Sequence, residues 1–212
     1  MSPLERYELD LAQKSFIKDD AQKVIIQCLN DLYKELLNTP SQLTEKKGFF
    51  SILKAKSEPL LLAPKGLYLW GGVGQGKTYL MDIFYDSLPF KEKQRTHFHR
   101  FMQKVHKQLG EIKNVEDPLQ KVADGISQRC RVLCFDEFFV SDITDAMLLG
   151  RLFEALFKRG ICLVATSNIE PDGLYNDGLQ RARFLPAIEA LKANCKVRKL
   201  DSGTDYRLRE LE

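Results

Sequence analysis

The chain has 212 residues, enough for one sizeable α/β domain with a smaller appendage. Its 32 basic and 29 acidic residues leave a net charge of +3, a small surplus for neutralising phosphates, so no nucleic-acid partner is expected. The start, MSPLERYELDLAQ, has no apolar signal-peptide core, and no run reaches the roughly 18 apolar residues of a membrane span, so neither segment is expected.

Residues 1–38 are predicted to form an N-terminal helical segment. Asp19 and Asp20 can cap a helix that runs to about Asn38. The apolar side chains of this helix recur at helical spacing, at Ile25, Leu29, Leu32 and Leu36. One face of the helix is therefore expected to pack against the rest of the protein.

Residues 39–65 are predicted to form a polar, basic linker. Within them, NTPSQLTEKKGFFSILKAKSEP is interrupted by two prolines. The apolar FFSIL has lysines on both sides and has two interpretations. It is either a short helix that contacts a membrane surface or a partner, or a linker segment tucked against the core.

From Gly66 to the end, residues 66–212 alternate between strand-like and helix-like segments. The expected strands are GLYLWG, RTHFHRF, RVLCFDEF, ICLVATSN and CKVRKLD. The expected helices are Lys77–Asp86, Pro118–Arg129, Asp142–Lys158 (closed by Gly160) and Leu185–Asn194. This alternation predicts an α/β fold with a parallel sheet covered on both faces. Its ligand is expected at the carboxyl ends of the strands.

The glycine cluster between the first strand and its helix matches the phosphate-binding pattern G-x-x-x-x-G-K-[ST]. The residues expected to hold the phosphates are Gly71, Gly72, Val73, Gly74, Gln75, Gly76, Lys77 and Thr78. Glycines let backbone N–H groups close around an anion, and the following helix directs its positive end to the same place. Lys77 supplies charge to the phosphates and Thr78 offers a hydroxyl to Mg²⁺, so the sequence predicts ATP and Mg²⁺ as ligands.

An acidic pair, Asp136-Glu137, ends the apolar strand RVLCFDEF. Asp136 can hold the Mg²⁺ that Thr78 also contacts. Glu137 points to the other side and can orient or deprotonate an attacking water. The pair favours hydrolysis over transfer to a metabolite, which would more often require a separate acceptor pocket.

Two further polar groups are candidates for contacting the transferred phosphate. Asn168 follows the fourth strand and can touch the γ-phosphate or the water. A hydrolase also needs positive charge there in the transition state, and Arg181 or Arg183 can supply it, most plausibly to a neighbouring subunit.

The histidines and cysteines favour structural interpretations over metal sites. His97 and His99 are expected on one side of the second strand and the loop after it, with His106 further on, and no carboxylate or cysteine completes a metal site. The five cysteines are an odd number without a C-x-x-C pair: Cys28, Cys130, Cys134, Cys162 and Cys195. Since four of them lie in apolar strands or helices, reduced buried thiols in a cytoplasmic protein are expected.

Taken together, several motifs resemble the Afg-type AAA+ ATPases, a family with bacterial cell-division members and mitochondrial relatives. The motifs are GLYLWGGVGQGKTYLMDIFYDSLP, THFHRFMQKVH, VLCFDEFFVSDITDAMLLGRLFEALF, LVATSN and GLQRARFLPAI. The resemblance extends from the DDAQ helix to the closing DYRLR. It is greatest for the gammaproteobacterial members, where DEFFVSDITDAM occurs in this form.

The resemblance implies a P-loop AAA+ core with a five-stranded parallel sheet in the order 5-1-4-3-2. Asp136-Glu137 would be the Walker B pair, Asn168 the first sensor and Arg181 the arginine finger. The family also implies a ring of six subunits. The segment Asp20–Gln22 would lie near the adenine. The loop after the second strand would face the central channel of the ring.

Family members are expected to hydrolyse ATP, to bind the tubulin-like FtsZ and to destabilise its polymers at the division site in the cytoplasm. One alternative is a nucleotide-gated scaffold, in which nucleotide only switches shape and partner affinity. The mitochondrial relatives imply another, an inner-membrane quality-control ATPase with peripheral membrane contact. Relatives continue beyond the position of Glu212 into a helical lid, which is absent from this chain.

Overall fold

The computed structural model describes residues 1–13, 19–39 and 63–201. The segments FFSIL and DYRLR both lie outside these residues, so the two interpretations of FFSIL stay open. The boundaries expected at residues 38 and 66 likewise remain a prediction.

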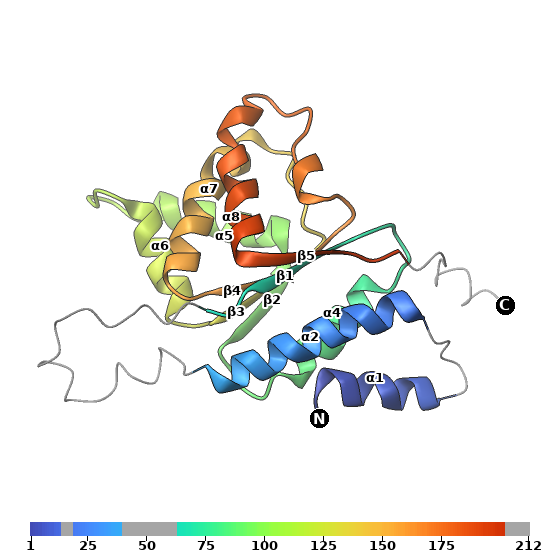
Figure 1. Ribbon diagram of the computed structural model, residues 1–212. Coiled ribbons are helices and arrows are strands. Elements are labelled where there is room, and N and C mark those ends of the chain that lie inside the picture. The colour runs from blue at the N-terminus through green and yellow to red at the C-terminus, as the bar shows by residue number, and fades with distance from the viewer. Residues whose placement is uncertain (14–18, 40–62, 202–212) are drawn as a thin grey trace, which may run out of the picture.

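The core is a five-stranded parallel sheet in the order β2-β3-β4-β1-β5, which confirms the predicted order (Figure 1). The strands are β1 (Gly66–Trp70), β2 (Lys93–His97), β3 (Val132–Asp136), β4 (Cys162–Ser167) and β5 (Cys195–Lys199). The register pairs Trp70 with Ser167 and His97 with Asp136. Side chains that follow these four strand ends therefore meet at one edge of the sheet.

Helices cover both faces of this sheet, as Figure 1 shows. One layer contains α1 (Pro3–Ala12), α2 (Asp20–Asn38) and α4 (Lys77–Ser87). The other contains α5 (Phe98–Glu111), α6 (Pro118–Ser127), α7 (Ile143–Lys158) and α8 (Leu185–Asn194). Two short 3-10 helices, η2 (Pro171–Gly173) and η3 (Arg181–Arg183), precede α8.

The alternation of side chains along the inner strands explains why both faces are apolar. In β3, Val132 and Cys134 pack into the α2/α4 layer, whereas Leu133 and Phe135 pack into the α5–α8 layer. Successive strand residues point to opposite faces, so a strand buried on both sides must be apolar throughout. This is why RVLCFDEF reads as a continuous apolar run.

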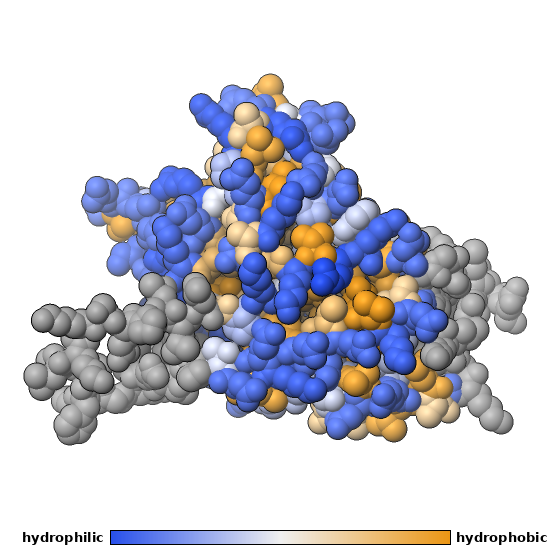
Figure 2. Space-filling view, in the orientation of Figure 1, coloured by the Kyte–Doolittle hydropathy of each residue, from blue (hydrophilic) through white to orange (hydrophobic). Residues whose placement is uncertain are grey.

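Helix α2 follows the predicted bounds and has the predicted apolar face. Ile25, Leu29, Leu32 and Leu36 are all buried, and Asp19 caps the helix by accepting hydrogen bonds from the N–H groups two and three residues later. The opposite face of α2 is exposed and mostly hydrophilic (Figure 2). In the described part of the chain, no helix combines the length and apolarity that crossing a bilayer requires.

The prediction for the second strand was wrong at its carboxyl end. The strand ends at His97, and Phe98–Met102, expected to form the end of the strand and the loop after it, instead begin the long helix α5. The buried side chains of α5 are Phe98, Phe101, Met102 and Val105, a spacing of three, one and three residues. That spacing is typical of a helix face, and the alternating histidines of HFHRF concealed it.

Helix α1 is an element that the sequence prediction missed. Its polar composition obscured a start signal, a capping box in which Ser2 and Glu5 bond each other's backbone N–H groups, followed by Pro3 at the first turn. Tyr7 is 1% exposed, and its ring lies 6.4 Å from that of Tyr79 on α4. The N-terminal helices thus share one apolar cluster with β1 and α4.

Four cysteines are buried with free thiols, as predicted: Cys130, Cys134, Cys162 and Cys195. Burial raises the pKa of the Cys130 thiol to about 11, so this thiol stays protonated near neutral pH. Their part in the fold is packing.

Candidate nucleotide-binding site

The phosphate-binding loop lies between β1 and α4, where glycine conformations shape it. Gly76 is the N-cap of α4 with φ 86°, in the left-handed region that favours glycine. A Cβ built there would lie 2.5 Å from the side-chain nitrogen of Gln22. The loop is therefore closely packed from the α2 side, and its backbone is open toward the sheet edge.

Lys77 bends back over the loop. Its Nζ donates to the carbonyl oxygens of Gly71 at 2.8 Å and Gly72 at 2.5 Å. Burial lowers the pKa of Lys77, because the ammonium group has lost part of its hydration without gaining a carboxylate. An anion in this loop would supply the missing negative charge, so the site fits a phosphate.

A cavity of about 480 Å³ opens at the carboxyl edge of the sheet. Its lining residues are Val73, Gly74, Gln75, Gly76, Lys77, Thr78, Tyr79, Glu137, Thr166, Ser167 and Asn168. Three separate segments of the sequence, the loop and the ends of β3 and β4, therefore share one space. The structure brings the predicted Glu137 and Asn168 to the phosphate-binding loop.

Asp136 ends β3 and is held by a residue that sequence reasoning missed. Arg95 of β2 binds both carboxylate oxygens of Asp136, with Nε–Oδ2 at 2.7 Å and Nη2–Oδ1 at 3.0 Å. Arg95 also donates to Asp82 of α4. The two carboxylates raise the pKa of Arg95 above its ordinary value despite partial burial. An arginine two residues before the end of an edge strand was the available signal, but its partner depends on the strand order.

Glu137 adopts a left-handed backbone, with φ 52°, which is uncommon for a residue with a side chain. Its N–H donates to the hydroxyl of Thr166 at 3.3 Å. The carboxylate is exposed and lies 3.6 Å from Nδ1 of His97. The turn thus directs the Glu137 side chain into the cavity, while Asp136 points to Arg95.

Ser167 is the last residue of β4, and Asn168 follows it directly. The hydroxyl of Ser167 donates to the carbonyl of Phe138 at 2.7 Å and accepts from the N–H of Ile169 at 3.1 Å. These bonds tie the β4 end to the segment after β3. Asn168 is exposed and lines the cavity, which is the position expected for a side chain that contacts phosphate or water.

Arg181 and Arg183 lie on η3, away from the residues that line the cavity. Arg181 is half-buried, and its Nη2 donates to the carbonyl of Asp172 at 2.5 Å. Its Nε is buried without a hydrogen-bond partner among the described residues. Arg183 is exposed. The chain does not bring either arginine to its own phosphate-binding loop.

The start of α2 touches the loop directly. The side-chain amide of Gln22 is buried and donates to the carbonyl of Gln75 at 3.2 Å. The segment Asp20–Gln22 is thus beside the phosphate-binding loop. Its expected contact with adenine remains a prediction.

The three histidines have three different partners. His97 lies beside Glu137, His99 is 3.0 Å from the amide of Gln103, and His106 is 2.6 Å from Asp145. Among the residues that the structure describes, no three metal-binding side chains come together.

The comparisons with known proteins agree with this geometry. The AFG1-like ATPase family matches residues 1–212. The chain is 53% identical over 215 residues to Cell division protein ZapE of Escherichia coli K12, covering 100% of this chain and 57% of that protein. It is 46% identical over 160 residues to Lactation elevated protein 1 homolog B of Danio rerio, covering 70% of this chain and 32% of that protein. The chain thus spans little more than half of the first relative.

Solved structures with low sequence identity share the fold. DnaI has a TM-score of 0.59 at 17% identity, covering 92% of this chain and 88% of that one. AMPPCP-bound DnaA of Aquifex aeolicus has a TM-score of 0.58 at 13% identity, covering 92% and 51%. These similarities show the fold, and together with the family match they show a P-loop AAA+ core. The family match over residues 1–212 establishes that the chain belongs to the AFG1-like ATPase family.

Proposed function

We propose that this chain is the nucleotide-binding core of an ATPase that acts on FtsZ polymers at the bacterial division site, on the cytoplasmic side. The cavity that joins the phosphate-binding loop to Glu137 and Asn168 is the observation that carries the proposal. The similarity to Cell division protein ZapE supports the cellular process.

In this proposal the loop Gly71–Thr78 binds the triphosphate of ATP. Backbone N–H groups surround the phosphates, and the positive end of α4 adds to the attraction. The ammonium group of Lys77 exchanges the carbonyls of Gly71 and Gly72 for phosphate oxygens. Because the exchange restores a counter-charge to a partly desolvated cation, it favours binding.

The donor set for a divalent cation is the Thr78 hydroxyl and the Asp136 carboxylate, hard oxygens of the kind that Mg²⁺ prefers. Bound Mg²⁺ would offset the charge of the phosphates. Arg95 binds both oxygens of the Asp136 carboxylate and so fixes its orientation, and Mg²⁺ would share this carboxylate with Arg95. Glu137, exposed in the cavity, accepts a proton from the attacking water, and Asn168 orients that water or the γ-phosphate.

Arg181 of one subunit is proposed to reach the γ-phosphate bound by its neighbour in a hexameric ring. An arginine in this role contributes roughly 10³–10⁵ in rate. No residue of η3 is among the residues that line the cavity of its own chain, which supports a role in trans. Arg183 is the alternative donor from the same 3-10 helix.

The proposal is tested by measuring ATP turnover of the full-length protein with and without FtsZ filaments, with filament mass followed by light scattering. The wild type is compared with Glu137→Gln, which keeps the size of the side chain but cannot accept the proton. We expect the wild type to hydrolyse ATP and to lower the scattering, and the variant to bind ATP and do neither.

Two other outcomes would point elsewhere. If scattering falls equally with Glu137→Gln, nucleotide acts only as a switch, and the protein is a nucleotide-gated scaffold. If neither protein affects filaments while ATP is hydrolysed, the FtsZ assignment is wrong and a quality-control ATPase at the inner membrane becomes the better proposal.

A further inference from the structure

A groove lies between α5 and α6, beside the edge strand β2 and outside the proposed nucleotide site. It consists of two adjoining cavities of about 340 Å³ and 250 Å³ that share Gln108 and Glu111. The first cavity is lined by Gln94, Phe101, Lys104, Val105, Lys107, Gln108, Glu111, Ile126 and Arg129. We call the two together the α5–α6 groove.

The base of the groove is apolar. Phe101, Val105 and Ile126 present their edges to the first cavity and are at most 6% exposed. The second cavity continues this base with Ile112 and Val122. A volume of this size fits one or two apolar side chains of a bound segment.

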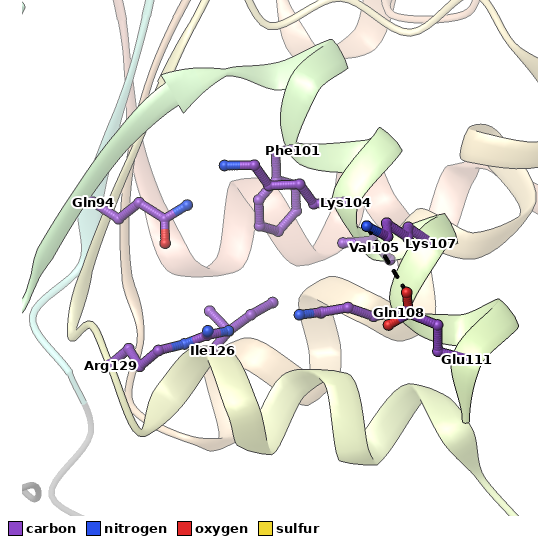
Figure 3. Close-up of a pocket in the computed structure, with 9 residues that line it drawn as sticks. All are labelled: Gln94, Phe101, Lys104, Val105, Lys107, Gln108, Glu111, Ile126 and Arg129. Atoms are coloured by element: carbon purple, nitrogen blue, oxygen red, sulfur yellow. Dashed lines mark ion pairs between the residues drawn. The ribbon is translucent and has the colours of Figure 1, made fainter. Parts of the chain in front are cut away.

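The walls of the groove are polar and predominantly basic. Figure 3 shows Gln94 from β2 and Lys104 and Gln108 from α5 extending into the space beside Phe101 and Ile126. Extended main chain offers donors and acceptors in alternation, which amide side chains can match. The walls therefore suit a polypeptide whose backbone lies along the groove.

The charges along the α5–α6 groove indicate which kind of polypeptide it can bind. The basic side chains on the two cavities are Lys104, Lys107, Lys121 and Arg129, against a single acidic one, Glu111. Glu111 is paired with Lys107 at 3.9 Å. Within the described part of the chain, Lys104, Lys121 and Arg129 have no carboxylate partner, and the guanidinium of Arg129 donates only to the carbonyl of Gly125. Three cations are thus left for an external anion.

We infer that the α5–α6 groove binds an acidic protein segment that inserts an apolar side chain between α5 and α6. Nucleic acid fits the same charges less well. Binding of single strands uses exposed aromatic faces for stacking, but Phe101 is 2% exposed and its ring packs 4.7 Å from that of Phe135. The inference stands on the groove alone and does not depend on ATP hydrolysis.

The inference is tested by fluorescence anisotropy of a fluorescein-labelled peptide in which two leucines are flanked by glutamates and aspartates. The comparison probes are the same peptide with serines for leucines, the same peptide with lysines for the acidic residues, and a labelled single-stranded oligonucleotide. The key variant is Lys104→Glu with Arg129→Glu. Its matched control is Lys23→Glu with Lys34→Glu, an equal charge change on exposed residues of α2, on the opposite face of the sheet.

We expect the acidic leucine peptide to bind the wild type and the α2 control equally. It should bind the groove variant on the order of tenfold more weakly, because attractive pairs at a partly desolvated surface become repulsive. The serine and lysine peptides should bind much more weakly. If the groove variant does not fold, Lys104→Gln with Arg129→Gln removes the same charges without adding acidic ones.

Four results would overturn the inference. They are no binding of the acidic leucine peptide at low salt, equal binding of the serine peptide, tighter binding of the oligonucleotide, and equal weakening by the α2 control.

Discussion

The guanidinium of Arg95 offsets the negative charges of Asp82 and Asp136 beside the candidate site. It spans from β2 to Asp136 on β3 and to Asp82 on α4, so one guanidinium joins two strands and a helix. With only 20% of its side chain exposed, Arg95 contributes both to stability and to the orientation of Asp136. The same pairing occupies both oxygens of the Asp136 carboxylate, which is also the proposed Mg²⁺ ligand, so the guanidinium and the metal would share this carboxylate.

Replacing Arg95 with methionine should separate these two roles. Loss of the paired hydrogen bonds is expected to lower the free energy of unfolding by about 2 kcal/mol, the typical contribution of bonds to charged groups. Asp136 is then free, so the variant should gain more stability from added Mg²⁺ than the wild type. Urea unfolding with and without Mg²⁺ measures both effects.

Arg159→Met is the matched control for this experiment. Arg159 pairs with Asp124 at 2.9 Å, is 22% exposed and lies outside the candidate site. It should lose stability and show no additional response to Mg²⁺. An identical Mg²⁺ response in both variants would contradict the shared-carboxylate interpretation.

Lys77→Ala tests the phosphate-binding loop. Two lost charge-assisted bonds to phosphate, at about 1.5–3 kcal/mol each, predict ATP binding weakened by roughly 100-fold or more. A fluorescent ATP analogue measures the affinity, and Lys91→Ala, at an exposed lysine, serves as the control. Tight ATP binding by Lys77→Ala would refute the proposed role of the loop.

Helices α1 and α2 form a cover for the nucleotide end of the fold. Gln22 at the start of α2 holds the carbonyl of Gln75, and Tyr79 of α4 donates to Asp10 of α1 at 2.8 Å. The α2/α4 layer is therefore mechanically connected to the phosphate-binding loop. A conformational change in the phosphate-binding loop would therefore act first on α1 and α2.

Tyr7→Ala tests whether α1 is an integral part of this layer. The ring is 1% exposed, so its removal is expected to lower the free energy of unfolding by about 3 kcal/mol, in the range for deleted buried aromatic rings. Leu9→Ala on the same helix is the control, because Leu9 is 53% exposed and should change little. Thermal or urea unfolding gives both values, and equal small effects would mean that α1 packs only peripherally.

As one unit, the fold places its nucleotide cavity, η3 and the α5–α6 groove on different parts of the surface. The cavity is lined by the loop after β1 with the start of α4, by the residue after β3 and by the end of β4, but by no arginine from η3. If Arg181 acts in turnover, as proposed, it would act on the site of a second copy. This is the assembly argument behind the proposed ring.

Mixing subunits tests that argument. Arg181→Ala is expected to bind ATP normally and lose turnover, and Lys77→Ala is expected to lose binding. A mixture of the two should recover activity, because intact sites in the Arg181→Ala subunits receive Arg181 from Lys77→Ala neighbours. ATP turnover against mixing ratio is the measurement. Strict additivity of two inactive proteins would exclude Arg181 as a residue acting in trans, and the series repeated with Arg183→Ala would test the alternative.

Local signals in the sequence were sufficient for most elements and for most of the residues that line the cavity. The glycines of the loop, the apolar run of β3 and the capped, periodic helix α2 each report their own conformation, because turn chemistry and side-chain periodicity act between near neighbours. In HFHRF the alternating histidines suggested a strand, although the apolar residues have helical spacing, so the predicted strand end was wrong. At Ser2 the capping signal lies in a polar stretch, so helix α1 was not predicted.

Contacts between residues that are distant in the chain could not be predicted from local signals. Arg95 with Asp136, Gln22 with Gln75 and His97 with Glu137 join residues that are distant in the chain. Each pairing depends on strand order, register and helix placement, which follow from the burial of all apolar surfaces at once rather than from any one segment. The sequence by itself thus determined that a phosphate-binding α/β core forms. Tertiary packing decided which charges meet at its edge and left the α5–α6 groove open.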